Sequence, residues 1–354
     1  MPATSALISC LAVLSIERTA AISASLAVRA SISYGRRWRE RPGGIGMEKQ
    51  RLGGLDGLRA IAAFGVIAFH YDGEGLFYYG LLGIELFFVI SGFVILMTIE
   101  KTGSVLNFAF HRAARLYPAY WLSVIVAGTI LLVQNEASLA TVLVNLTMLQ
   151  SFVKFHNLID PYWTLAFELW FYVILAAIFA CRGLGYIEYI SLAWLALMTL
   201  ARAFTMNGDH NLIYSPLIRI LAMPTFGHLF IAGMMLYRLH TGRGTRLTLL
   251  VLIWAVFYSA FGRHDWSEIP HPPYLLLTAI IVALVWVAVS RNPMLLSNAP
   301  LTWIGRRSYS AYLLHFPLFL LFGKTVPALC LLAPAMMASY RYVERPFQRL
   351  SHAG

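Results

Sequence analysis

Apolar residues occur along this chain in long stretches that are separated by short polar or basic segments. An apolar helix of about 20 residues crosses the hydrocarbon core of a lipid bilayer. The pattern therefore predicts an all-α, polytopic membrane protein with about ten transmembrane helices. We predict these spans at residues 58–71, 80–99, 117–133, 163–181, 187–204, 217–239, 247–262, 274–290, 308–323 and 325–341.

A further apolar stretch, residues 139–153, is short and carries several polar side chains between Thr141 and Gln150. Cytoplasmic loops of membrane proteins are enriched in Lys and Arg, so the basic residues can decide whether this stretch crosses. If it did, the basic cluster at 238–246 would lie outside. We therefore predict ten crossings with both termini cytoplasmic, and an interfacial or re-entrant segment at 139–153 on the outer side.

The composition agrees with a membrane protein and argues against other classes. Hydrophobic residues make up 59% of the chain and charged residues 12%, about half the charge of a soluble domain. The formal charge of +11 comes from basic residues that are spread between the apolar stretches. Because these basic residues form no continuous stripe, we predict that the protein contacts membrane lipids and does not bind nucleic acid. Cys10, Cys181 and Cys330 lack the spacing of a metal site or disulfide, so we expect packing roles.

The first 46 residues differ from the rest. A modest apolar run is followed by an Arg-rich stretch between Arg36 and Arg41, whereas a signal peptide carries its positive charge before the apolar region. We expect residues 1–46 to be a poorly ordered or dispensable extension, upstream of a second start at Met47. Residues 47–354 then form the membrane domain.

Two ionisable residues, Arg59 and His70, lie inside the first predicted span. Such residues are rare within membrane helices and usually serve a function. At 1.5 Å per residue they lie about 16 Å apart along the helix axis. If Arg59 is at the cytoplasmic edge, His70 lies near the middle of the bilayer, and histidine is well suited to moving a proton near neutral pH.

Glu85 lies five residues into the second predicted span, which is too deep for an ordinary loop charge. A carboxylate that faces His70 from a neighbouring helix would fix the tautomer of the imidazole and stabilise its cation. We therefore predict that Glu85 orients His70. The alternative is a structural ion pair between two helices.

Arg112 and Arg115 precede the third span at positions i and i+3, so they share one face of a helix. Two guanidinium groups on one face suit a phosphate group, which each can bind through two hydrogen bonds. The alternative is that these arginines only anchor the span at the cytoplasmic surface.

A polar face is also predicted at the start of the fourth span. Glu168 is one turn below Thr164 on the same face, and Trp163 marks the outer interface. These three residues would line a cavity that opens to the outside, or Glu168 would bond a neighbouring span. We expect a structural role for His315, because Pro317 frees backbone groups that need hydrogen-bond partners.

The chain resembles the acyltransferase 3 family, membrane-bound enzymes that O-acylate extracytoplasmic glycans, and the likeness runs from about Gly54 to Pro346. Six segments carry it, in order: LDGLRAIAAFGVIAFH, GIELFFVISGF, RAARLYPAYW, WTLAFELWFY, SYSAYLLHFP and VERP. The resemblance is closest to members that modify exopolysaccharide or lipopolysaccharide. Many members continue into a soluble SGNH-type domain, whereas this chain ends at Gly354, so we expect the membrane domain or a separate partner to reach the acceptor.

The resemblance implies a reaction and a role for each residue. An acyl group, usually acetyl, passes from acyl-coenzyme A in the cytoplasm to a sugar hydroxyl on the far side of the inner membrane. His70 becomes catalytic with Glu85 beside it. Arg59, Arg112 and Arg115 would bind the phosphates of the donor. Trp163, Thr164 and Glu168 would bind the glycan or lipid-linked sugar. No tightly bound cofactor and no metal are expected.

The mechanism and the class of protein stay open at this level. His70 could act as a general base on the acceptor hydroxyl, or accept the acyl group itself and pass it on. A transporter or flippase of a glycan intermediate would also use intramembrane His and Glu residues. A scaffold with structural ion pairs only is the third interpretation.

Overall fold

The computed structural model describes residues 52–153, 155–206, 223, 225–262 and 271–353. Within these residues every regular element is a helix and no strand occurs. The predicted extension, residues 1–46, lies outside the described residues, and the predicted span 217–239 is described as a helix only from Gly227. The all-α class is confirmed for the part of the chain that the structure describes.

Each predicted span overlaps one long helix. These helices are α2 (Gly53–Tyr71), α4 (Leu82–Lys101), α5 (Val105–Val133), α7 (Tyr162–Ala180), α8 (Ile187–Met206), α11 (Gly227–His240), α12 (Arg246–Gly262), α13 (His271–Ser290), α16 (Ser308–Phe322) and α17 (Val326–Ser339). Short elements connect or follow them: α3 (Gly75–Tyr78), α6 (Leu139–Asn145), α14 (Met294–Ser297), α15 (Ala299–Gly305), a π-helical turn (Tyr340–Glu344) and α18 (Arg345–Ala353).

Six helical segments of the described chain are long and apolar enough to cross a membrane. They are Gly75–Lys101, Val105–Val133, Tyr162–Ala180, Gly183–Phe204, Pro273–Ser290 and Val326–Ser351. Two shorter apolar helices, Arg246–Ala260 and Ser308–Phe322, accompany them. The described part of the chain is therefore helical and of membrane character.

Residues 139–153 do not form a spanning helix. Helix α6 has seven residues, a rise of only about 10 Å. The segment folds back against α5, because the hydroxyl of Tyr120 donates to the carbonyl of Asn145 (2.7 Å) and the indole of Trp121 donates to the carbonyl of Leu146 (3.0 Å). This agrees with the prediction that the segment does not cross.

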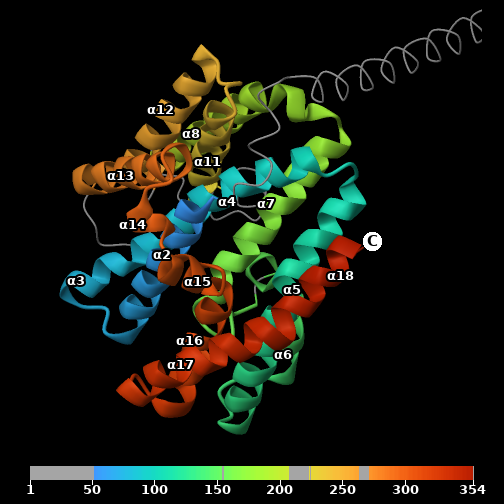
Figure 1. The fold of residues 1–354 in the computed structure, drawn as a ribbon, viewed down its shortest axis with the longest axis vertical. Coiled ribbons are helices and arrows are strands. Elements are labelled where there is room, and N and C mark those ends of the chain that lie inside the picture. The colour runs from blue at the N-terminus through green and yellow to red at the C-terminus, as the bar shows by residue number, and fades with distance from the viewer. Residues whose placement is uncertain (1–51, 154, 207–222, 224, 263–270, 354) are drawn as a thin grey trace, which may run out of the picture. The chain divides into compact units, whose positions relative to one another are not determined.

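Helix α4 occupies the centre of the described bundle. It packs against α2, α5, α7, α11 and α13. In Figure 1 the helices α8, α11, α12 and α13 gather at one end of the molecule, and α5, α6, α16, α17 and α18 gather at the other. Helices α2, α4 and α7 pass between the two groups, so residues on these three helices can reach both.

Helices α4 and α11 approach each other closely through two glycines. A Cβ atom on Gly92 would lie 2.1 Å from the carbonyl oxygen of Phe230, and one on Gly233 would lie 2.0 Å from the carbonyl oxygen of Val89. Small residues allow membrane helices to gain packing contacts without a hydrophobic driving force. The glycines therefore fix which face of α4 meets α11.

We predict that Gly92→Ala lowers the free energy of unfolding by about 1–3 kcal/mol, because the added methyl group forces two helix backbones apart. Thermal unfolding of the detergent-solubilised protein measures this. Gly103→Ala is the matched control, since a Cβ at Gly103 meets nothing within 4 Å. Equal unfolding temperatures for the two variants would contradict the close approach.

Candidate active site

A cavity of about 750 Å³, a volume that includes its open mouth, lies between α2, α4, α5, α7 and α16. Its apolar wall comes mainly from α4 and includes Phe87, Phe88 and Val94. Its polar side chains come from all five helices: Arg59, Ser91, Arg112, Arg115, Thr164, Glu168, Tyr172, Ser308, Tyr309 and Tyr312. The cavity thus brings together five of the eight site residues predicted from the sequence.

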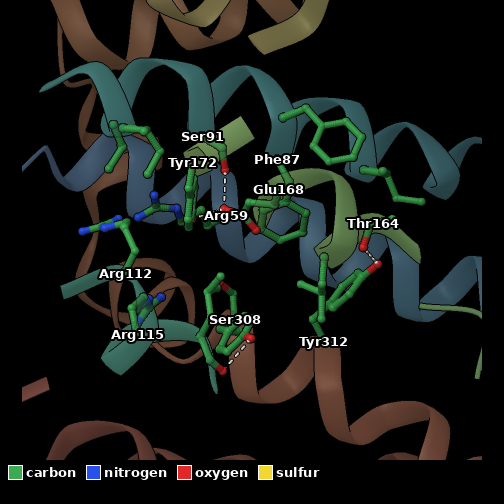
Figure 2. Close-up of a pocket in the computed structure, with 17 residues that line it drawn as sticks. Arg59, Phe87, Ser91, Arg112, Arg115, Thr164, Glu168, Tyr172, Ser308 and Tyr312 are labelled. Atoms are coloured by element: carbon green, nitrogen blue, oxygen red, sulfur yellow. Dashed lines mark hydrogen bonds between the residues drawn. The ribbon is translucent and has the colours of Figure 1, made fainter. Parts of the chain in front are cut away.

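The three predicted arginines lie at one end of this cavity (Figure 2). Arg59 comes from α2, and Arg112 and Arg115 come from α5. The guanidinium of Arg112 lies 5.8 Å from the ring centre of Tyr172, and within the described residues its Nε is buried without a hydrogen-bond partner. Arg59 lies 3.7 Å from Asp56. Three cations converge here with incomplete pairing, so this end suits an anion.

Arg115 is held from behind by a carboxylate that the sequence analysis did not assign. Its Nη1 lies 3.1 Å from Oε2 of Glu344, which is 1% exposed. Ser310 donates a short hydrogen bond to the other carboxylate oxygen. Glu344 is the last residue of the π-helical turn, and such turns often occur at functional sites. The VERP segment therefore positions an arginine of the cavity.

Glu168 lies in the middle of the cavity (Figure 2). Its Oε1 accepts hydrogen bonds from the hydroxyls of Ser91 (2.9 Å) and Tyr172 (2.5 Å). Within the described residues, Glu168 accepts hydrogen bonds from hydroxyl groups and forms no ion pair with an arginine. Sequence reasoning placed Glu168 on a separate, outer face, whereas the structure places it in the same cavity as the arginines.

The end of the cavity away from the arginines is closed by two hydroxyl groups (Figure 2). Thr164 Oγ1 lies 2.7 Å from the hydroxyl of Tyr312, and both hydroxyls lie within hydrogen-bond distance of the carbonyl of Pro161. This contact joins α7 to α16. The side chain of Tyr312 therefore lines the cavity, while its backbone belongs to helix α16.

Trp163 does not line the cavity. Its ring stacks on Phe226 at 5.1 Å and packs against the edge of Phe167. Neighbouring residues of a helix are rotated by about 100°, so Trp163 cannot share the face of Thr164. Trp163 therefore does not line this cavity beside Thr164, and a contact between Trp163 and a substrate stays a prediction.

His70 lies just beyond Tyr312, in contact with two groups from distant parts of the chain. Its Nδ1 is 3.1 Å from Nε2 of His315, and its Nε2 is 3.2 Å from Oδ2 of Asp160. His315 in turn donates from Nδ1 to the backbone carbonyl of Tyr312 at 2.7 Å. The His70 side chain is 9% exposed and Asp160 is 61% exposed. These contacts link the four groups in one line that ends at the exposed carboxylate of Asp160.

The carboxylate beside His70 is Asp160, and the prediction that Glu85 fills this place is wrong. Glu85 shares the face of α4 that carries Val89 and Gly92, because these residues are four and seven positions on. That face meets α11. Glu85 is fully buried, and the two ring nitrogens of His70 contact Asp160 and His315 instead.

The prediction for His315 also needs correction. Pro317 has no N–H, so it leaves the carbonyl of Leu313 without its helical hydrogen bond. Ser123 of α5 donates to this carbonyl at 2.7 Å. The carbonyl that Pro317 frees is thus satisfied by a serine, whereas His315 donates to the carbonyl of Tyr312 and contacts His70.

The described residues hold no cluster of three or more His, Cys, Asp or Glu side chains that could bind a metal ion. His70, His315 and Asp160 are arranged in a line, and the two nitrogens of His70 face opposite partners. A line of this kind suits proton transfer, as in catalytic triads. The site combines three arginines at one end of a cavity with a histidine whose contacts suit proton transfer.

The sequence profile of the acyltransferase 3 family, described as an acyltransferase domain, matches residues 52–340. The chain belongs to this family. The protein "Putative O-acetyltransferase SACOL0978" of Staphylococcus aureus strain COL is 28% identical over 84% of this chain and 57% of its own length. The O-acetyltransferase OatA of S. aureus strain NCTC 8325 is 26% identical over the same shares.

The chain spans a little over half of the length of these curated relatives. No solved structure matches it. The family profile covers all the cavity residues, together with His70, Asp160 and His315, and ends four residues before Glu344. The acyltransferase 3 domain of this chain therefore contains both the arginine end and the histidine end of the site.

We predict that Glu344→Ala lowers the free energy of unfolding by about 1–3 kcal/mol, because Ser310 and Arg115 lose a buried acceptor. Thermal unfolding in detergent measures the change. Arg349→Gln, an exposed change on the following helix α18, serves as the control. An unfolding temperature equal to that of the control would show that the Arg115–Glu344 pair contributes nothing to the fold.

Proposed function

We propose that this protein is a multi-pass inner-membrane O-acetyltransferase. It transfers an acyl group, most often acetyl, from cytoplasmic acyl-coenzyme A to a hydroxyl of an extracytoplasmic or lipid-linked glycan. The observation that carries the proposal is a single cavity that begins at three arginines and ends one side chain away from a buried histidine. Membership of the acyltransferase 3 family supports it.

The donor is proposed to bind with its phosphates at the arginine end. Arg59, Arg112 and Arg115 reach the cavity from two helices, and guanidinium groups bind phosphate oxygens through paired, charge-assisted hydrogen bonds. The apolar wall of α4 then accommodates the extended arm of coenzyme A. Thr164 and Glu168 line the path of this arm, so we assign them to the donor side and no longer to the acceptor.

In the reaction, the hydroxyl oxygen of the acceptor attacks the thioester carbonyl carbon, and its proton moves to Nε2 of His70. The carbon–sulfur bond breaks, and the leaving thiolate takes the proton back from His70. The products are the O-acyl sugar and the free thiol of coenzyme A. Asp160 lies 3.2 Å from the same nitrogen, so its carboxylate stabilises the imidazolium between the two proton transfers.

The acceptor is proposed to arrive on the side of Asp160, which is exposed and lies opposite the arginine end. Relatives carry the name O-acetyltransferase, which supports a hydroxyl acceptor. A glycan fits this side because a carboxylate next to a histidine can bind neighbouring sugar hydroxyls. Donor and acceptor then meet at His70 from two directions.

We predict that Arg115→Ala weakens the binding of acetyl-coenzyme A to the purified protein by about 10–100-fold, since a charge-assisted hydrogen bond contributes about 1.5–3 kcal/mol. Titration calorimetry in detergent measures this. Arg291→Ala, an exposed arginine after α13, leaves binding unchanged. His70→Ala retains binding but abolishes O-acetyl signals in the NMR spectra of host surface glycans when it complements a deletion strain.

Two results would contradict the proposal. Equal binding of acetyl-coenzyme A by the wild type and Arg115→Ala would remove the donor assignment. O-acetyl signals that stay the same in deletion, wild-type and His70→Ala strains, with a change in glycan export, would indicate a transporter of a glycan intermediate.

We further propose ten crossings with both termini in the cytoplasm, so that the arginine end of the cavity faces the donor. In a variant that lacks Cys10, Cys181 and Cys330, a membrane-impermeant maleimide should label Glu136→Cys in intact cells. It should label Gly103→Cys only after permeabilisation. The opposite pattern would reverse the orientation and with it the cytoplasmic source of the donor.

A further inference from the structure

We infer that His315 is the positioning residue that keeps a proton on Nδ1 of His70 and so makes Nε2, the nitrogen beside Asp160, the atom that releases and takes up a proton. This inference rests on the proposed acyl transfer, because it assigns the reactive atom of the proposed base. It applies equally if His70 accepts the acyl group itself, since the same nitrogen would then be the nucleophile.

The argument starts at the backbone of α16. His315 Nδ1 lies 2.7 Å from the carbonyl oxygen of Tyr312. A carbonyl can only accept a hydrogen bond, so this nitrogen carries the proton. His315 is completely buried, which makes its charged form costly. The neutral ring therefore presents Nε2 as an acceptor.

That acceptor determines the state of His70. Nδ1 of His70 lies 3.1 Å from Nε2 of His315, so it must be the donor of this hydrogen bond. The neutral form of His70 then has no proton on Nε2. The 3.2 Å contact between Nε2 and Oδ2 of Asp160 is a hydrogen bond only while Nε2 also carries a proton, as in the imidazolium form of His70. Because Nδ1 keeps its proton on the side of His315, the imidazolium loses its proton from Nε2. Nε2 is the nitrogen that can take a proton from an incoming hydroxyl.

The opposite tautomer of His70 is disfavoured because the Tyr312 carbonyl cannot move, whereas the Asp160 carboxylate can. It would place a proton on Nε2 of His70 and require either a second proton on buried His315 or a bare Nδ1 facing the carbonyl of Tyr312. That carbonyl is fixed inside a helix. Asp160 is 61% exposed on the turn before α7, so its carboxylate can rotate away or share a hydroxyl with Nε2.

The surroundings hold the two rings in register. Their centroids are 5.1 Å apart with an interplanar angle of 28°. Phe316 packs edge-on against His70 at 5.7 Å, and Phe319 packs edge-on against His315 at 5.7 Å. Such packing restricts ring rotation, which is the requirement for a preorganised base.

The direct test is the tautomer of His70, read by ¹⁵N NMR of histidine-labelled protein at alkaline pH, where histidine is neutral. The signal is assigned by its loss in His70→Gln. Wild type and His315→Gln should carry the proton on Nδ1, because the amide oxygen of Gln replaces the acceptor. His315→Phe keeps a ring of similar size without an acceptor, and the proton should move to Nε2, toward Asp160.

Kinetics of acetyl transfer provide the second measurement. His315→Phe should lower kcat by about 100–1,000-fold, the size of a lost general-base contribution, with KM for acetyl-coenzyme A nearly unchanged. His315→Gln should retain activity within about tenfold of the wild type. His240→Phe, at the far end of α11, controls for the loss of a histidine.

The outcomes separate the two proposals. A wild-type His70 with its proton on Nε2, or the same tautomer in wild type and His315→Phe, would overturn the role of His315. A loss of kcat in both His315 variants without a tautomer change would also overturn it, since that indicates a packing role. The expected tautomers in a protein with no acetyl transfer would instead overturn the proposed function.

Discussion

The interior of this protein depends on the requirement that a charge removed from water must have a partner. The described residues meet it with ion pairs between elements that are distant in sequence: Arg238 with Glu188 (3.1 Å), Arg243 with Glu100 (2.6 Å) and Arg115 with Glu344 (3.1 Å). Each pair connects two helices or a helix and a turn. An apolar bundle gives little preference between neighbouring arrangements, so these pairs, with the close glycine contacts of α4 and α11, specify which helices meet.

The central cavity is the place where this requirement is met only in part. Arg112 stacks on aromatic rings, and Glu168 is satisfied by two hydroxyls. These opposite charges line the same cavity without an ion pair between them. If they were paired, the cavity would be a structural contact. Arg112 is instead held by rings and Arg115 by Glu344 from behind, which is the arrangement that the proposed binding of a phosphate-bearing donor requires.

The sequence singled out three arginines that the structure brings into one cavity, but it did not predict the partners of His70. Arg59, Arg112 and Arg115 stand out because a charge next to an apolar run is visible locally, and helical periodicity places two of them on one face. The partners of His70 are Asp160 and His315, at separations of 90 and 245 residues. Only the packing of α2 against α16 and the turn before α7 brings them together. Glu85 is nearer to His70 along the chain than Asp160 is. The helix face that carries a residue, and not its depth in the membrane, decides which residues it contacts.

The same packing explains how one bundle could join two reactants without carrying either across. Tyr312 borders the cavity with its side chain and holds His315 with its carbonyl, so a single residue separates the donor path from the histidine pair. His70 lies between that residue and the exposed Asp160. In the proposed reaction, the donor arm reaches Tyr312 from the arginine end and the acceptor hydroxyl reaches Asp160, so that both arrive next to the histidine pair. Under this proposal only the acyl group changes sides, and the phosphates of the donor remain with the arginines.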